Sequence, residues 1–350
     1  MNIASRLRLC ALPLAVSLAL AACGGSSAPS AATDTAAPAA TTEGQPAAVE
    51  LPAGWQRVAG TDVPALAGQS PALPTTVQSD DGAQAEVSDI SRIIAGGDDV
   101  IAVLEALGLG KQVYAAPTNT TTQAGQAAPH QFLFNRTTGV EGVVSLHGSL
   151  FLGNSLRRHT VLAGKLREVG ESAVVIDDLQ PAPDKVRKVA AAVGLADAGQ
   201  TLATEVQRQL DEAAAVGKGL AHAPRVIHVS ATGGGGTPTV AGADSASAEM
   251  IALAGGINVG SEAGVKNYSQ LSNEGVIAAA PEVILVTEHD LQQFGGADGL
   301  WKAYPTLKQT PAGAANRVWV MPDVQLKYTS VGTGAGALAL AKALAALPPA

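Results

Sequence analysis

Two neighbouring arginines, Arg157 and Arg158, have the plainest binding chemistry in this sequence. They follow the apolar run Leu150-Phe151-Leu152, which indicates a buried strand, and they open a helical stretch over 156–168. In open α/β sheets, ligands bind beyond the carboxyl ends of the strands, so this position points the pair at a ligand cleft. Guanidinium groups hold carboxylates through bidentate hydrogen bonds, so an anionic ligand is expected there. The alternative is that the pair merely begins a surface helix.

No catalytic motif accompanies the arginines. The sequence lacks the His-Glu-x-x-His pattern of zinc proteases and the Ser-His-Asp order and spacing of serine hydrolases. It also lacks a pair of carboxylates placed to face each other across a cleft. The glycine run 233–236 leads into Thr237-Pro238 instead of the Gly-Lys-Ser/Thr of a phosphate-binding loop, so we interpret it as a turn in a cleft wall. A secreted metal-dependent hydrolase using His130 and His159 remains an alternative, although no activating carboxylate motif supports it. The residues therefore favour a binding protein over an enzyme.

The elements that must position these residues alternate between strand and helix, which predicts an α/β fold with mostly parallel sheets. In the first half we expect strands at 92–95, 111–116, 150–152 and 173–176, with helices at 99–107, 140–146 and 156–168. In the second half we expect strands at 225–230, 283–287 and 318–321, with helices at 245–254, 273–280 and 335–347. Asp98 is expected to cap the first helix, and Asp80-Asp81-Gly82 to form a hairpin turn.

A stretch of helix-forming residues, 184–217, separates the two halves. Its apolar residues recur at helical spacing, and Gly194 interrupts it once, so we predict a long helix with a possible break there. The expected organisation is a signal peptide (1–22), a flexible tether and N-terminal extension (23–74), an N-terminal lobe (75–180), a connecting helix (181–220) and a C-terminal lobe (221–350). The predicted fold is therefore two Rossmann-like lobes joined by a long interdomain helix.

One short segment recurs in both lobes. Val140-Glu141-Gly142-Val143 precedes the strand at 150, and Asn273-Glu274-Gly275-Val276 precedes the strand at 283 with the same spacing. Each glutamate alone could simply favour the positive end of its helix, which is worth about 0.3–1 kcal/mol. That reading does not explain why the whole segment repeats. We therefore expect Glu141 and Glu274 to occupy equivalent positions in the two lobes.

The N-terminus predicts export. Arg6 and Arg8 precede a short apolar run that ends in Leu20-Ala21-Ala22-Cys23, a secretory signal too short to span a bilayer. Cys10 is lost with that signal, so Cys23 is the only cysteine of the mature chain, which excludes an intramolecular disulfide and a cysteine-rich metal site. Residues 24 to about 50 are mostly Gly, Ser, Ala, Thr and Pro and suit a flexible tether. The 30 acidic against 22 basic side chains argue against a nucleic-acid partner.

Several stretches together resemble the substrate-binding lipoproteins of ABC importers for iron chelates, haem and cobalamin. The small-small-Cys ending resembles a bacterial lipobox, in which the cysteine is diacylated. The other stretches are Arg92-Ile93-Ile94-Ala95-Gly96-Gly97, the segment 233–242, Met250-Ile251-Ala252-Leu253-Ala254-Gly255-Gly256-Ile257-Asn258, and 268–282. The resemblance covers about residues 75 to 345, and its C-terminal part is most similar to the haemin-binding branch. It implies two lobes with a ligand cleft between them, and a lipid-anchored position outside the membrane.

The resemblance also implies roles for individual residues. Glu141 and Glu274 match glutamates that dock onto arginines of the permease. Haemin binders of this family often carry an iron-ligating tyrosine in the loop after the second strand, but here that loop, 117–129, contains none. His130 and Tyr328 are then the candidate ligands of haem iron, and His159 and Tyr268 are further candidates near the ligand. Arg157 and Arg158 would hold the propionates. For His130 a solvated loop histidine is the alternative, and for Tyr328 a helix-packing role.

The expected function is therefore capture of haem (haemin) by a monomeric protein that is not an enzyme, and its delivery to an ABC permease with its ATPase. Haem would be the transported ligand and not an intrinsic cofactor. A ferric siderophore or cobalamin on the same scaffold is the alternative ligand.

Overall fold

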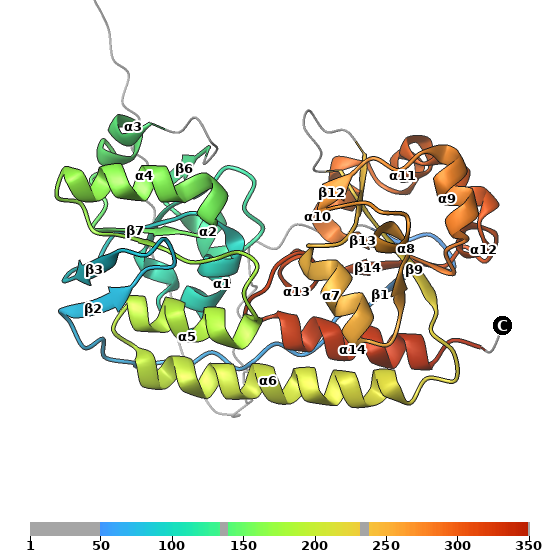
Figure 1. The fold of residues 1–350 in the computed structure, drawn as a ribbon, viewed down its shortest axis with the longest axis horizontal. Helices are drawn as coiled ribbons and strands as arrows, with labels where there is room; N and C mark the ends of the chain where they lie inside the picture. Colours follow the sequence, from blue (N-terminus) through green and yellow to red (C-terminus); the bar gives the residue numbers. More distant parts are fainter. Residues whose placement is uncertain (1–49, 134–138, 232–237, 349–350) are drawn as a thin grey trace, which may run out of the picture. The chain divides into compact units, whose positions relative to one another are not determined.

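The computed structural model describes residues 50–133, 139–231 and 238–348 (Figure 1). Cys23, the signal peptide, the tether before residue 50 and the glycine run 233–236 lie outside these residues. Two α/β lobes follow one another along the chain, as the alternation of strands and helices predicts. No helix within the described ranges is both long and apolar enough to cross a membrane.

The N-terminal lobe contains a parallel sheet in the order β6-β5-β4-β7-β8. Its strands are β4 (Ile93–Ala95), β5 (Val113–Pro117), β6 (His130–Phe132), β7 (Leu150–Gly153) and β8 (Ala173–Val175). The predicted hairpin is present as β2 (Thr75–Gln78) and β3 (Gln84–Val87), an antiparallel pair. Because β4 to β8 all run in one direction, their carboxyl ends share one edge of the sheet.

Helices cover both faces of this sheet. The helices within the lobe are α1 (Asp98–Ala106), α2 (Gln123–Ala127), α3 (Val140–Val144) and α4 (Leu156–Glu168), with a 3-10 turn, η1 (Gly110–Gln112). One core packs α1 and the connecting helices against one face, and a second core packs α3 and α4 against the other. The polar loop predicted at 117–129 contains the short helix α2, which Thr122 caps by accepting a hydrogen bond from Gly125 N. The sequence did not predict α2, because Gln, Gly and Thr give no periodic pattern of apolar residues.

The connecting segment is two helices, α5 (Ala182–Ala192) and α6 (Ala196–Lys218). They break at Gly194, where φ is +73°, a left-handed conformation that glycine adopts without strain. The first half of α6 contributes Leu202 and Val206 to the core of the N-terminal lobe, while Ala213 in its second half belongs to a core of the C-terminal lobe. The predicted long helix and its break are both present, and α6 joins the lobes through their cores.

The C-terminal lobe contains a mixed sheet in the order β1-β14-β13-β9-β10-β12, with β11 also paired to β9. Its strands are β1 (Gln56–Arg57), β9 (Arg225–Ser230), β10 (Thr239–Ala241), β11 (Ile257–Asn258), β12 (Tyr268–Ser269), β13 (Val283–Thr287) and β14 (Val318–Met321). Strands β9, β13 and β14 are parallel, whereas β10 is antiparallel to both of its neighbours, β9 and the edge strand β12.

Two cores enclose this sheet. Helices α6, α7 and α14 pack on one face, and α9 to α12 pack on the other. The helices are α7 (Ala246–Leu253), α8 (Val259–Glu262), α9 (Asn273–Ala279), α10 (Glu288–Gln293), α11 (Ala297–Ala303), α12 (Pro311–Ala314), α13 (Asp323–Leu326) and α14 (Thr333–Ala345), with a 3-10 turn, η3 (Pro305–Gln309). In Figure 1, α14 (red) lies alongside α6 (yellow), and the two helices are in contact.

The N-terminal extension after residue 50 is packed against both lobes. Strand β1 pairs in parallel with β14, and Trp55 is buried in a core of the C-terminal lobe. Further along, Val63 belongs to the core of the N-terminal lobe, and Leu66 N donates to Ala106 O. This extension therefore adds a strand to a sheet whose other strands begin some 170 residues later. A two-residue strand with exposed side chains leaves no periodic signal, so the sequence did not predict it.

Candidate functional site

The carboxyl edge of the N-terminal sheet carries a buried charge pair. After β4, Gly96-Gly97 turns the chain into α1, whose second residue is Asp99. Asp99 is 1% exposed; its carboxylate lies 2.7 Å from Lys185 Nζ on α5 and accepts a hydrogen bond of 2.7 Å from Asn154 Nδ2. A Cβ on Gly97 would lie 2.0 Å from Asn154 Nδ2, so glycine is needed for this close approach. The pair anchors α1, α5 and the end of β7 to one another.

Asp98 does not cap α1, contrary to the sequence prediction. Gly97 occupies the N-cap position, and Asp98 is the first residue of the helix. Its buried carboxylate accepts hydrogen bonds from the Thr120 hydroxyl, from Thr121 N at 2.8 Å and from Thr121 Oγ1 at 2.7 Å. Burial raises the pKa of Asp98, while these hydrogen bonds act against the rise. The polar loop after β5 thus folds onto the same edge as Asp99.

The start of α4 adds positive charge to this edge. Arg157 and Arg158 are exposed in the first turn, and Arg158 Nη2 lies 3.4 Å from Asn154 Oδ1. His159 is fully buried beneath them, where its Nδ1 accepts a hydrogen bond from Asn154 N at 3.0 Å. Burial and the neighbouring Arg158 charge lower the pKa of His159 to about 4, so the ring is neutral at physiological pH. His159 supports the arginine-bearing turn from below.

The carboxyl edge of the C-terminal sheet holds a second buried pair. Lys327 Nζ, after α13, lies 3.0 Å from Asp290 Oδ2 on α10. Asp290 is fully buried and also accepts hydrogen bonds from Ser230 Oγ at 3.2 Å and Ala231 N at 3.1 Å, at the end of β9. Asp323 lies nearby and accepts from His289 N at 3.0 Å; burial raises its pKa.

Tyr268 and Tyr328 both lie beside this second pair. The Lys327 ammonium is 5.9 Å from the centre of the Tyr268 ring, and the Tyr268 hydroxyl is 3.0 Å from Ser247 Oγ. Tyr328 follows Lys327 directly and is half-buried. Burial raises its pKa, and the carboxylates of Asp98 and Asp323 raise it further. Lys327, just before Tyr328, pairs with Asp290 of the C-terminal lobe, whereas Thr329 and Ser330, just after it, donate to the N-terminal lobe, so Tyr328 lies where the two lobes meet.

The backbone around Tyr328 joins the lobes directly. Thr329 Oγ1 donates to Asp178 O at 3.0 Å, and Ser330 Oγ donates to Asp99 O at 2.7 Å. Val331 then enters the core of the N-terminal lobe. The segment after α13 therefore belongs to the C-terminal lobe by sequence and packs against the N-terminal lobe.

His130 lies apart from this group. It is the first residue of β6, and its ring packs edge-on against Tyr114, with centroids 4.6 Å apart. The Arg92 guanidinium, just before β4, lies 6.0 Å from the Tyr114 ring. His130 therefore neighbours residues at the amino-terminal side of the strands, whereas Tyr328 neighbours residues that follow their carboxyl ends. Tyr268 and Tyr328 lie at the carboxyl edge of the C-terminal sheet, and Arg158 with its support His159 lies at that of the N-terminal sheet, where Asn154 links it to Asp99. His130 lies at neither edge.

Glu141 and Glu274 occupy the matching positions that their repeated segments predict. Each is exposed in the first turn of a short helix, α3 or α9, that leads into a central strand. The following valines, Val143 and Val276, are buried and fix each helix on its sheet. The Ser272 side chain caps α9, whereas the N-cap residue of α3, Gly139, makes no side-chain cap.

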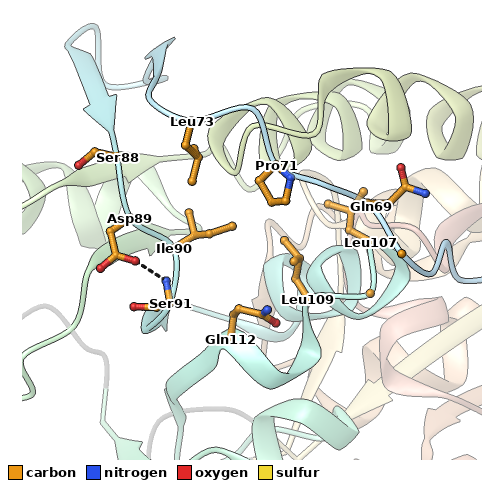
Figure 2. A pocket seen from close by; sticks show the side chains of 12 residues that line it. Gln69, Pro71, Leu73, Ser88, Asp89, Ile90, Ser91, Leu107, Leu109 and Gln112 are labelled. Carbon is orange, nitrogen blue, oxygen red and sulfur yellow. Dashed lines mark hydrogen bonds between the residues drawn. The ribbon is translucent and has the colours of Figure 1, made fainter.

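A pocket of about 440 Å³ lies at the opposite end of the N-terminal sheet (Figure 2). It lies between the N-terminal extension at Pro71 and Leu73 and the turns that precede β4 and β5, at Ile90 and Leu109. Asp89 is the only charged residue among those that line it within the described structure. The pocket therefore offers no cation to an anionic ligand and is separate from the residues at the carboxyl edges.

Sequence reasoning missed Lys185, Asp99, Asn154, Asp290 and Lys327. A lysine in an amphipathic helix reads as a solvated residue, and only the tertiary structure shows that Lys185 is fully buried. Two signals in the sequence point to the other residues: Lys327 is adjacent to the candidate ligand Tyr328, and Asp99 follows the Gly-Gly turn after a predicted strand. A search for polar residues directly after each predicted strand would have found Asn154 and Asp99.

Comparison with known proteins supports this architecture. The chain is similar to the apo structure of the periplasmic haem-binding protein RhuT from Roseiflexus sp. RS-1, at 30% identity and a TM-score of 0.65, covering 73% of this chain and 98% of that one. It is also similar to the periplasmic haem-binding protein BhuT in complex with two haems, at 28% identity and a TM-score of 0.62, covering 72% and 98%. The haem-binding protein HmuT, at 24% identity and a TM-score of 0.70 over 84% and 98%, shares the fold.

No curated protein sequence matches the chain significantly. The profile of the periplasmic binding protein family matches residues 93–324, which run from the first strand of the N-terminal sheet to α13. The resemblance inferred from the sequence is thus confirmed at the level of family and fold, and the chain belongs to the periplasmic binding protein family.

Proposed function

We propose that this protein binds haem between its two lobes and delivers it to an ABC permease without changing it chemically. The observation that carries the proposal is the position of Tyr328 in the segment that joins the lobes, between Lys327, which pairs with Asp290, and Thr329 and Ser330, which donate to the N-terminal lobe. The similar proteins RhuT and BhuT are haem-binding proteins, which makes haem the favoured ligand for the same scaffold.

Tyr328 is the proposed ligand of the ferric iron. A tyrosine phenolate is a known axial ligand of haem iron. Without ligand, burial and the nearby Asp98 and Asp323 carboxylates raise the pKa of Tyr328, so its phenol is protonated. The same carboxylates attract a ferric cation, which would replace the phenol proton. Iron binding at this residue would therefore release a proton.

The propionates have cationic partners in this proposal. Arg157 and Arg158 are exposed at the rim of the N-terminal lobe, and Arg158 is linked through Asn154 to Asp99, a neighbour of Tyr328. Guanidinium groups hold carboxylates by charge-assisted hydrogen bonds, and the planar fork adds specificity. Lys185, by contrast, is fully buried in its pair with Asp99 and has a structural role.

Docking and anchoring complete the proposed function. Glu141 and Glu274, exposed on matching helices, would each meet one half of a permease, whose ATPase drives transport. A lipid on Cys23 would hold a monomeric protein outside a bacterial membrane, with the segment after it as the tether.

A titration of the purified protein tests the ligand. Haemin, a ferric siderophore and cobalamin are added separately, and visible spectra and dissociation constants are recorded. We expect a Soret band that saturates at a defined haemin ratio and much weaker binding of the other two. Tight binding of the siderophore or of cobalamin, without a saturable Soret band, would replace haem by that ligand on the same scaffold.

A further inference from the structure

Two hydrogen bonds connect the centre of the C-terminal sheet to Tyr268. His228, in the middle of β9, has its Nδ1 2.9 Å from Ser247 Oγ on α7. Ser247 Oγ is in turn 3.0 Å from the hydroxyl of Tyr268 on β12. The rings of His228 and Tyr268 also pack edge to face, with centroids 5.7 Å apart. His228 and Ser247 are both fully buried, whereas Tyr268 is only half-buried.

At the inner end of this chain of hydrogen bonds, one buried nitrogen of His228 has no hydrogen-bond partner among the described residues. His228 Nε2 is buried and has no hydrogen-bond partner within the described part of the chain. Burial lowers the pKa of His228 to about 3, so the ring is neutral and carries one N–H. That single proton can reside on Nε2 or on Nδ1, and its position sets the direction of the hydrogen bond between His228 and Ser247.

The two directions differ in where they leave an unsatisfied donor. With the proton on Nε2, Tyr268 donates to Ser247 and Ser247 donates to Nδ1, which leaves an N–H orphaned in the core. With the proton on Nδ1, His228 donates to Ser247. The Ser247 O–H is fully buried, and donating it to the Tyr268 hydroxyl 3.0 Å away satisfies it. The unused donor is then the Tyr268 O–H, on a residue that is partly exposed. In this arrangement Nε2 is an unpaired acceptor, whereas in the first it is an orphaned N–H. Orphaned N–H groups in protein cores are rarer than unpaired acceptors, so the second direction is favoured.

We propose, on the basis of the proposed haem-binding function, that His228 and Ser247 are positioning residues which turn the Tyr268 O–H outward as a hydrogen-bond donor to a carboxylate of the ligand. Tyr268 is then a residue for recognising a haem propionate, distinct from Tyr328 at the iron. Its hydroxyl accepts from Ser247 and keeps its own proton for the ligand.

The charges around Tyr268 agree with a donor role. Burial raises its pKa, and the Asp290 and Asp323 carboxylates raise it further, so the phenol keeps its proton. Lys327 stands over its ring and is bound to Asp290, which leaves this pair without net charge. A propionate that approaches the hydroxyl therefore meets an Asp290 carboxylate compensated by Lys327. The Lys327 charge also acts on Asp323, the other carboxylate near Tyr268.

The tautomer of His228 is measurable without any ligand. In ¹⁵N-labelled wild-type protein, the imidazole nitrogen shifts separate a protonated from an unprotonated Nδ1, and His228→Asn assigns the signals. We expect a proton on Nδ1 of His228. A proton on Nε2 would overturn the proposed direction, whether or not the protein binds haem.

Haem and its dimethyl ester, in which both propionates are blocked, test the role toward the ligand. Tyr268→Phe and Ser247→Ala should each weaken haem binding by about 3- to 10-fold, the loss of one hydrogen bond, and leave binding of the ester nearly unchanged. Ser247→Ala should cost nothing further in the Tyr268→Phe background. His228→Asn, whose amide can still donate to Ser247, should retain more haem affinity than His228→Leu.

Two results separate the possible failures. Equal weakening of haem and ester by these variants would indicate a merely structural role and overturn the positioning proposal. A wild-type protein that shows no haem spectrum would instead overturn the proposed function, and with it the ligand assigned to Tyr268, while the tautomer measurement would still stand.

Discussion

Lys185 and Asp99 form a completely buried ion pair, with Nζ 2.7 Å from Oδ2, between the first connecting helix and the edge of the N-terminal sheet. The same Asp99 accepts a hydrogen bond at its backbone carbonyl from Ser330 of the other lobe. One residue thus links the ion pair within a lobe to the contact between lobes. A buried pair stabilises weakly when complete, but removal of one partner leaves an uncompensated charge.

Replacing Lys185 should therefore be costly. Lys185→Met leaves the Asp99 carboxylate buried without its cation, and we expect the free energy of unfolding to fall by about 3–5 kcal/mol in urea denaturation. Arg187→Ala on the same helix is the matched control, because the side chains of Arg187 and its partner Asp184 are 40% and 48% exposed, against 0% and 1% for Lys185 and Asp99. That control should cost less than about 1 kcal/mol. Equal effects of the two variants would show that the buried pair has no special role.

Acid should destabilise the protein through His159. The unfolded histidine binds a proton near pH 6.5, whereas burial and Arg158 lower the pKa of the folded one to about 4. Between these values the unfolded state holds more protons, so stability falls as the pH drops from about 6.5 to 4, by up to about 3 kcal/mol.

A conservative variant isolates this effect. His159→Asn keeps an acceptor for Asn154 N and removes the titrating ring, so its stability should depend less on pH over this range. His147→Asn removes an exposed imidazole, at a left-handed backbone position that asparagine tolerates, and serves as the control. Stability is measured at each pH by thermal unfolding. If the stability of His159→Asn falls with pH as steeply as that of wild type, His159 is not the source of the acid destabilisation.

Glu141 and Glu274 should act in docking and not in ligand capture. The double variant Glu141→Ala/Glu274→Ala should bind haem like wild type and fail to stimulate haem-dependent ATPase activity of the permease in proteoliposomes. Glu168→Ala/Asp298→Ala removes one exposed carboxylate from each lobe elsewhere and should keep stimulation. A large loss of haem affinity in the glutamate variant would move these residues into the ligand site.

Cys23 should carry a lipid. Mass spectrometry of membrane-fraction protein is expected to show a lipid-modified cysteine at the mature N-terminus, and Cys23→Ala should release the protein from the membrane. An alanine variant that stays bound to the membrane would contradict the anchor.

The sequence predicted the elements that have a strong local signal. Strands β9, β13 and β14 and helix α4 have the predicted limits, because each is a continuous apolar or amphipathic run between turn residues. The break at Gly194 and the matching positions of Glu141 and Glu274 were predictable for the same reason. Strand β1 was not, because its stability comes from pairing with β14 far along the chain.

The candidate site divides in the same way. Arg157 and Arg158 were found because a strand directly precedes them, and that rule depends on topology alone. The position of Tyr328 between the lobes depends on how α13 and the segment after it pack against α1. Neither charge pair was predictable, since sequence spacing does not show that Lys185 and Lys327 reach carboxylates 86 and 37 residues before them.

The most direct test of haem binding where the lobes meet is the visible spectrum and haemin affinity of Tyr328→Phe beside wild type and His130→Ala. All three proteins should remain folded, because Phe keeps the ring of Tyr328 and His130 is only half-buried. We predict that Tyr328→Phe shifts the Soret and charge-transfer bands and clearly weakens haemin binding, while His130→Ala resembles wild type. A wild-type spectrum in Tyr328→Phe, together with a shifted one in His130→Ala, would contradict the proposed site.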